Sequence, residues 1–104
     1  MSKNKPTINK IGYINYKISY VDELKDDDNE DLCGKFIPAK DEILIHNKIN
    51  LVAQKATLVH ETIHGIEDFT GIELTEEQVI ALGNMLFLWM NDNKNIIKFL
   101  IEGE

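Results

Sequence analysis

A polar pentapeptide inside an apolar stretch constrains this chain more than any other feature of its sequence. Residues 60–64 are HETIH, and Leu58, Val59 and Ile63 place apolar side chains around the histidines and the glutamate. These neighbours indicate that this part of the chain is buried, and burying two imidazoles and a carboxylate without partners is costly. The fold must therefore supply a partner for these groups, and a metal ion would do so.

The spacing of the motif predicts a zinc site on a helix. His60 and His64 are four residues apart, so on a helix they project from one face at successive turns. Two imidazoles placed in this way can reach one zinc ion at the ~2.0–2.1 Å of a zinc–nitrogen bond. Glu61, rotated by roughly 100°, can reach a water held by the metal and act as general base. Surface or satisfied core histidines are the alternative interpretation of so short a motif, and the apolar flanks favour the metal.

Cysteine usage favours a catalytic zinc over a structural one. A structural site is closed by four protein ligands, usually rich in cysteine, whereas a catalytic site has three protein ligands and a water. Cys33 is the only cysteine, which rules out both an internal disulfide and a cysteine-rich site. We expect a reducing cytoplasm as the location and a small buried residue at Cys33.

Two histidines leave a third ligand to be found. The candidates are the acidic and histidine side chains near the motif: Glu67, Asp68, Glu73, Glu76, Glu77 and His46. Glu76 and Glu77 open a second helix, which we expect to return antiparallel to the first. At about 100° per residue, Glu76 falls inside the apolar arc of that helix and Glu77 falls at its edge. We therefore predict Glu76 as the third ligand, Glu77 as the alternative, and His46 as an exposed strand end.

The apolar pattern predicts strands first and helices afterwards. Residues 8–22 predict a strand in which Gly12 marks a bulge or a turn that splits off a short first strand, and residues 33–37 and 43–46 predict a hairpin beside it. Helices are predicted over about residues 50–68, from the N-cap Thr75 with its capping-box partner Gln78 to residues 91–93, and over residues 95–101.

These elements predict an α+β fold class with a single zincin-like domain over residues 1–104. We expect a three-stranded antiparallel sheet packed on the motif helix and on a second, antiparallel helix. The connecting segments are short for the crossovers that parallel strand pairs need.

Most aromatic and large apolar side chains are assigned to packing. One side of the second helix is expected to face the core, with Trp89 as a core residue: Val79, Leu82, Leu86, Trp89 and Met90. A tyrosine of the first strand region could stabilise an oxyanion, but packing on a strand face is favoured for all three: Tyr13, Tyr16 and Tyr20.

The charge balance argues against two classes of partner. The formal net charge is −7, and all 11 basic residues are lysines. The chain therefore lacks both a basic stripe and the bidentate guanidinium group that reads guanine, so we expect no nucleic-acid partner. The same electrostatics argues against a membrane surface, and we expect neither a signal peptide nor a membrane span. The acidic residues 22–31 lack the spacing of an EF-hand and predict a solvated loop.

Taken together, these segments resemble a known family. A leading strand, a hairpin ending in ILIH at 43–46, LVHETIHG at 58–65 and TEEQV at 75–79 are similar to small phage-type, zincin-like metallopeptidases related to the ImmA/IrrE family. The resemblance extends from about Ile11 to Asn93. It implies that His60, His64 and Glu76 hold zinc and that Glu61 is the base. It also implies a role in mobile elements, where such proteins cleave repressors or have no known substrate.

Two functions from different classes follow from these observations. The leading one is a zinc-dependent metallopeptidase that hydrolyses a peptide bond in a cytoplasmic protein, with the substrate laid against an edge strand. The alternative is a zinc-containing binding module, an anti-repressor or inhibitor, whose acidic loop meets a basic protein. A pure binder should tolerate Glu61→Gln, whereas a peptidase should not. The substrate and the oligomeric state stay open.

Overall fold

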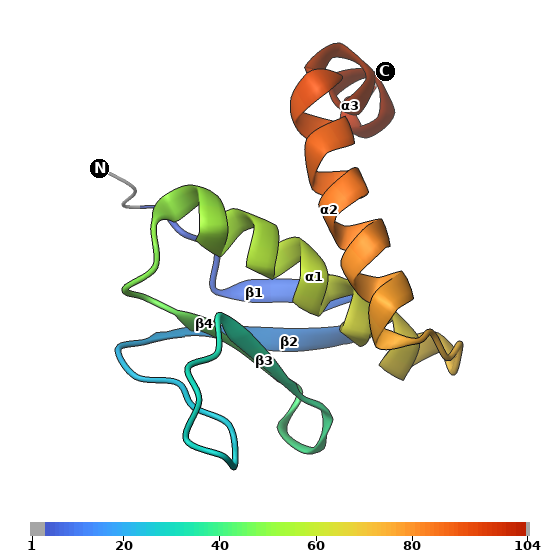
Figure 1. Ribbon diagram of the computed structural model, residues 1–104. Helices are drawn as coiled ribbons and strands as arrows, with labels where there is room; N and C mark the ends of the chain where they lie inside the picture. The colour runs from blue at the N-terminus through green and yellow to red at the C-terminus, as the bar shows by residue number, and fades with distance from the viewer. Residues whose placement is uncertain (1–3, 104) are drawn as a thin grey trace.

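The computed structural model describes residues 4–103 and confirms the α+β class (Figure 1). The sheet contains β1 (Ile8–Ile11), β2 (Ile14–Val21), β3 (Gly34–Ile37) and β4 (Glu42–His46). A 3-10 turn, η1 (Pro38–Lys40), joins β3 to β4, and α1 (Leu51–Thr70), α2 (Glu76–Asp92) and α3 (Lys94–Ile101) follow. Figure 1 shows α1 lying across the sheet, whereas α2 and α3 rise away from it.

The first strands form a hairpin whose turn depends on glycine. Gly12 has φ +61°, and a Cβ added there would overlap the Phe69 ring at the end of α1. Both the left-handed backbone and the close approach favour glycine. Tyr16 and Ile18 of β2 are buried while Lys17 between them is exposed, because alternate side chains point to opposite faces of a strand. The predicted split at Gly12 and the predicted alternation are therefore confirmed.

The predicted three-stranded antiparallel sheet is wrong. The sheet has four strands in the order β1-β2-β4-β3, and β2 pairs with β4 in parallel, from Lys17 opposite Glu42 to Val21 opposite His46. The predicted hairpin of β3 and β4 is present and antiparallel. The acidic loop and β3 together carry the chain back along the edge of the sheet, so β4 can run parallel to β2 without a helical crossover. The prediction failed because it allowed only direct crossovers.

The helix boundaries follow the capping signals. Asn50 caps α1 by accepting the N–H of Ala53, and α1 ends before Gly71, which has φ +81°. Thr75 and Gln78 form both hydrogen bonds of a capping box at the start of α2. These contacts satisfy backbone groups that a helix end leaves without partners. The predicted starts are thus confirmed, and α1 extends to Thr70, two residues beyond the predicted end.

The core lies between the sheet and α1. Its buried members come from three strands: Ile11, Tyr16, Ile18, Ile43 and Ile45. Leu58 and Phe69 of α1 pack against them. The predicted core face of α2 is wrong in large part, because only Val79 and Gly83 of that helix are buried and Trp89 is 38% exposed. Between residues 4 and 103 we find no helix with the length and apolar character that a membrane crossing requires.

Candidate metal centre

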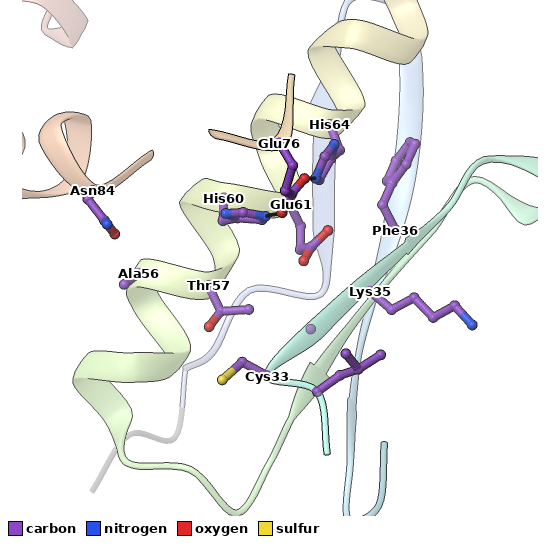
Figure 2. Close-up of a pocket in the computed structure, with 12 residues that line it drawn as sticks. Cys33, Lys35, Phe36, Ala56, Thr57, His60, Glu61, His64, Glu76 and Asn84 are labelled. Carbon is purple, nitrogen blue, oxygen red and sulfur yellow. Dashed lines mark ion pairs between the residues drawn. The ribbon is translucent and has the colours of Figure 1, made fainter. Parts of the chain in front are cut away.

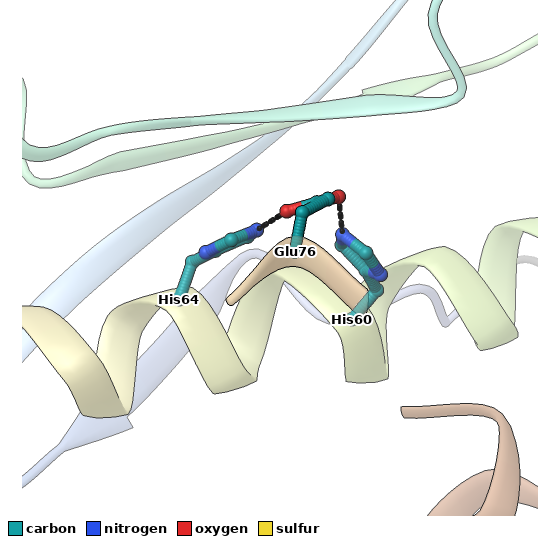
Figure 3. Close-up of side chains that lie close together, drawn as sticks. All are labelled: His60, His64 and Glu76. Carbon is teal, nitrogen blue, oxygen red and sulfur yellow. Dashed lines mark ion pairs between the residues drawn. The ribbon is translucent and has the colours of Figure 1, made fainter. Parts of the chain in front are cut away.

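Three potential ligands converge where α2 begins against the middle of α1. His60 and His64 project from adjacent turns of α1, and Glu76 reaches them from the first turn of α2 (Figure 3). Glu76 Oε2 lies 3.5 Å from His60 Nε2, and Glu76 Oε1 lies 3.5 Å from His64 Nε2. One ligand atom from each of the three residues lies within 4.8 Å of the others. Among residues 4–103, this is the single such group of histidine, cysteine and acidic side chains.

The packing of α2 on α1 brings Glu76 to the histidines, although its side chain stays 63% exposed. Val79 and Gly83 are the buried residues of α2, and Glu76 lies on the same side one and two turns before them. A Cβ at Gly83 would lie 3.5 Å from His60 Cα, which is ordinary contact distance, so the two helices approach closely at this point. Helix geometry thus selected the acidic residue that meets the histidines, and Glu77 is not part of the group.

The group has the chemistry and the spacing of a zinc site. Two histidines and a carboxylate are a donor set found in catalytic zinc sites. Ligands at ~2.0–2.1 Å from a tetrahedral zinc lie about 3.3–3.4 Å from one another. Each histidine nitrogen lies 3.5 Å from one of the two Glu76 oxygens, which is close to this separation, and the three ligand atoms lie within 4.8 Å of one another. The residues therefore fit the metal that the motif implies.

Burial acts on His60, and a carboxylate contact orients His64. Burial, followed by the neighbouring His64, lowers the pKa of His60, so its neutral form is favoured. His64 Nδ1 lies 2.8 Å from Glu67 Oε1. The Leu74 backbone N–H donates to the other oxygen of Glu67 and, together with His64, lowers the pKa of Glu67. An ionised carboxylate only accepts hydrogen bonds, so Nδ1 donates to Glu67 and Nε2 is the ring nitrogen on the side of Glu76.

Glu67 therefore has a role that the motif did not predict, which is to orient His64. The sequence suggested it as a third ligand, but it orients His64 from the side away from Glu76. Its spacing three residues after His64 is the signal that pointed to such a contact. Asp68, another ligand candidate, accepts a hydrogen bond from the Tyr16 hydroxyl at 2.7 Å instead.

Glu61 lies beside the three ligand candidates in a pocket between α1 and the edge strand β3. The pocket has a volume of about 500 Å³, and Figure 2 shows Glu61 directed from α1 toward β3. The side chain is 6% exposed, and burial raises its pKa to about 7. A carboxylate with a raised pKa can both accept and return a proton near neutral pH. Glu61 is thus a buried carboxylate beside the three potential ligands.

Gly34 allows β3 to approach α1 at the wall of this pocket. A Cβ at Gly34 would overlap Thr57 Cγ2 and would lie 3.0 Å from the Leu44 carbonyl oxygen and 3.2 Å from Glu61 Oε2. Cys33 precedes Gly34 and is exposed at the same pocket, so its predicted burial is wrong. It follows an exposed loop and comes before β3 begins, so no neighbouring layer covers it.

The other suggested participants lie away from the pocket. Tyr13 is 83% exposed and meets Phe69 edge-on, whereas Tyr16 is fully buried in the core. Tyr20 donates its hydroxyl proton to the Pro6 carbonyl. The packing interpretation is thus confirmed for Tyr16 and Tyr20 but is wrong for Tyr13, which lies exposed in the turn between β1 and β2. His46 ends β4 and accepts the backbone N–H of Lys48, outside the group that could hold a metal.

No family model, curated protein or solved structure matches this chain. Any assignment of function therefore depends on the geometry described above.

Proposed function

We propose that this protein is a zinc-dependent peptidase. His60, His64 and Glu76 hold the metal, and Glu61 is the general base. The observation that carries this proposal is the meeting of a two-histidine, one-carboxylate group, within 4.8 Å, with a buried glutamate in the same pocket. Three protein ligands leave one position of a tetrahedral ion for a water. This arrangement supports hydrolysis rather than a purely structural metal.

The chemistry divides between the metal and Glu61. A bound zinc ion supplies Lewis acidity and lowers the pKa of water to about 7. Glu61 accepts a proton as the water oxygen attacks the peptide carbonyl carbon. It then returns that proton to the amine nitrogen as the carbon–nitrogen bond breaks.

The edge strand supplies a way to hold an extended peptide. β3 pairs with β4 on one side only and also lines the pocket beside Glu61. A substrate strand added to β3 would gain backbone hydrogen bonds without needing deep side-chain pockets. Lys35 and Phe36 of β3 line the same pocket and would contact substrate side chains.

A second candidate, a binding module that keeps the zinc without cleavage, is supported by the acidic loop. The Asp26 side chain accepts the backbone N–H groups of Asp28 and Glu30, which fixes the turn. All three residues belong to a net negative surface segment between β2 and β3. Such a segment favours a basic protein partner.

Three single substitutions on two helices separate these functions. Glu61→Gln should retain zinc and thermal stability but lose about 10²–10⁴-fold in cleavage rate, because glutamine accepts no proton. Glu76→Gln should weaken zinc binding itself, since an amide is a poorer zinc ligand than a carboxylate. Glu77→Gln is the matched control, one residue further along α2 and outside the group, and it should change neither property.

Cleavage of denatured casein and of a mixed peptide library, followed by mass spectrometry, supplies the activity measurement. Metal analysis of the same samples supplies the zinc content. If zinc-loaded wild-type protein cleaves neither probe, or if Glu61→Gln cleaves as fast as wild type, the peptidase proposal is wrong. Full biological activity of Glu61→Gln would support the binding module instead.

A further inference from the structure

The second half of the molecule carries an apolar surface that its own chain leaves uncovered. We call residues 82–101, the outer part of α2 together with α3, the helical arm. Figure 1 shows this arm projecting away from the sheet and from α1. No residue of α3 is buried. An arm with so few contacts to its own domain needs another source of stability.

The exposed side chains of the arm are large and apolar. Phe99 is 80% exposed and Met85 is 59% exposed. The others share this character: Leu82, Leu86, Leu88, Trp89, Ile96, Leu100 and Ile101. In addition, residues 79–91 contain no charged side chain, in a chain of which 28% is charged. Leu82, Met85, Leu86 and Trp89 line one apolar pocket on this surface, and an exposed apolar patch of this kind marks an interaction site.

An apolar groove lies beside the arm, separate from the metal pocket. It has a volume of about 480 Å³ and lies where β1, α1, α2 and α3 meet. Ile8, Leu58 and Ile66 line its body side, and Leu86, Trp89 and Ile97 line its arm side. The same chain thus carries both a protruding apolar end, at Phe99 to Ile101, and an apolar groove.

The total exposed surface is too large for a compact monomer. The chain exposes 7451 Å², whereas a folded monomer of 11.9 kDa is expected to expose about 6,000 Å². At the ~160 Å² that each residue of an unfolded chain exposes, residues 1–3 and 104 contribute at most about 640 Å² of the difference. The radius of gyration of 14.1 Å also exceeds the roughly 12.9 Å expected for this length.

The remaining excess matches the surface that one subunit buries in a dimer. About 810 Å² is left after both subtractions, and a stable interface removes about 800 Å² from each partner. A second copy of this chain would cover that area with the arm and the groove that both copies possess. We infer that the protein forms a two-fold dimer in which the helical arm of each copy packs against the arm and groove of the other.

Two further features favour a second copy as the occupant. A two-fold axis places the protruding end of each copy against the groove of the other, so one operation satisfies both surfaces. Each copy carries a formal net charge of −7, and residues 79–91 bring no charge into the contact. Two chains of like charge can therefore meet there without direct repulsion, whereas elsewhere their acidic residues would oppose association.

Sedimentation equilibrium of the full chain at micromolar concentration tests this inference. The expected mass is twice the 11.9 kDa of one chain. Met85→Glu and Phe99→Glu should each return the protein to the monomer mass, because they bury a charge in an apolar contact. Ile72→Glu is the matched control, since Ile72 is 56% exposed but lies in the loop between α1 and α2. It should leave the dimer intact.

Several results would overturn the inference. They are a monomer mass for the wild type, an open-ended assembly larger than a dimer, and a dimer that survives both arm substitutions. A monomer that binds lipid vesicles or a different protein through the arm would also overturn it. If the arm variants unfold, the melting temperature of the wild type decides the question, because it rises with protein concentration only when the folded state is an oligomer.

Discussion

The orientation of His64 depends on a contact that lies outside the metal group. Glu67 holds Nδ1 at 2.8 Å while Nε2 faces Glu76, and the Leu74 N–H fixes Glu67 in turn. The sequence could place Glu67 near His64, because residues three apart on a helix are neighbours. It could not show which ring nitrogen Glu67 would meet, since that depends on the rotamers of both side chains. The side chain that hydrogen-bonds to a candidate ligand is therefore harder to predict than the candidate ligand itself.

Glu67→Gln should weaken zinc binding by about 10–100-fold, as loss of a carboxylate partner behind a ligating histidine typically does. Competition with a zinc indicator gives the affinity. Glu73→Gln is the matched control, because Glu73 is an exposed carboxylate in the nearby loop. The melting temperature of the zinc-free protein should change little in either variant. Equal zinc affinity in Glu67→Gln and wild type would show that this contact has no part in metal binding.

At the scale of elements, the ends of the helices could be predicted better than the pairing of the strands. Caps at Thr75 and Gln78 involve neighbours in sequence, so they could be predicted. The position of β4 between β2 and β3 could not, because it depends on contacts between segments far apart in the chain. The side of α2 that faces the domain could not be predicted either, for another reason. Apolar residues surround much of that helix, so periodicity alone did not separate Val79 from Trp89.

The contact of β3 with α1 makes a prediction at this scale. Gly34→Ala should lower the free energy of unfolding by about 1–3 kcal/mol, because the added methyl overlaps Thr57 Cγ2. Urea denaturation measures the change. Thr57→Ser removes that methyl group, so the double variant should recover part of the loss, which the Leu44 carbonyl limits. Gly103→Ala, with no neighbour within 4 Å, is the control. A stability loss in Gly34→Ala that Thr57→Ser fails to reduce would contradict this packing.

At the scale of the whole molecule, the chain combines a small core with a large apolar surface. The sequence assigned Leu82, Leu86 and Trp89 to the core, and the structure exposes them. A hydrophobic pattern indicates burial but does not distinguish burial inside one chain from burial between two chains. The polar residues of the motif differ from these apolar residues, because they contact a partner within the same chain. The three that lie together are His60, His64 and Glu76. The meeting of these three residues could therefore be predicted from their spacing. The exposure of the apolar side chains of α2 could not.

Metal analysis of purified protein, loaded with zinc and then freed of unbound ions, tests the central claim most directly. The proposed site predicts about one zinc ion per chain, bound through deprotonated ligands whose binding energy also stabilises the fold. His60→Ala and His64→Ala should each lose most of that zinc and melt at a lower temperature, while Glu77→Gln should match the wild type. A wild-type protein without zinc, or a double variant lacking both histidines that keeps a full equivalent, would contradict the account.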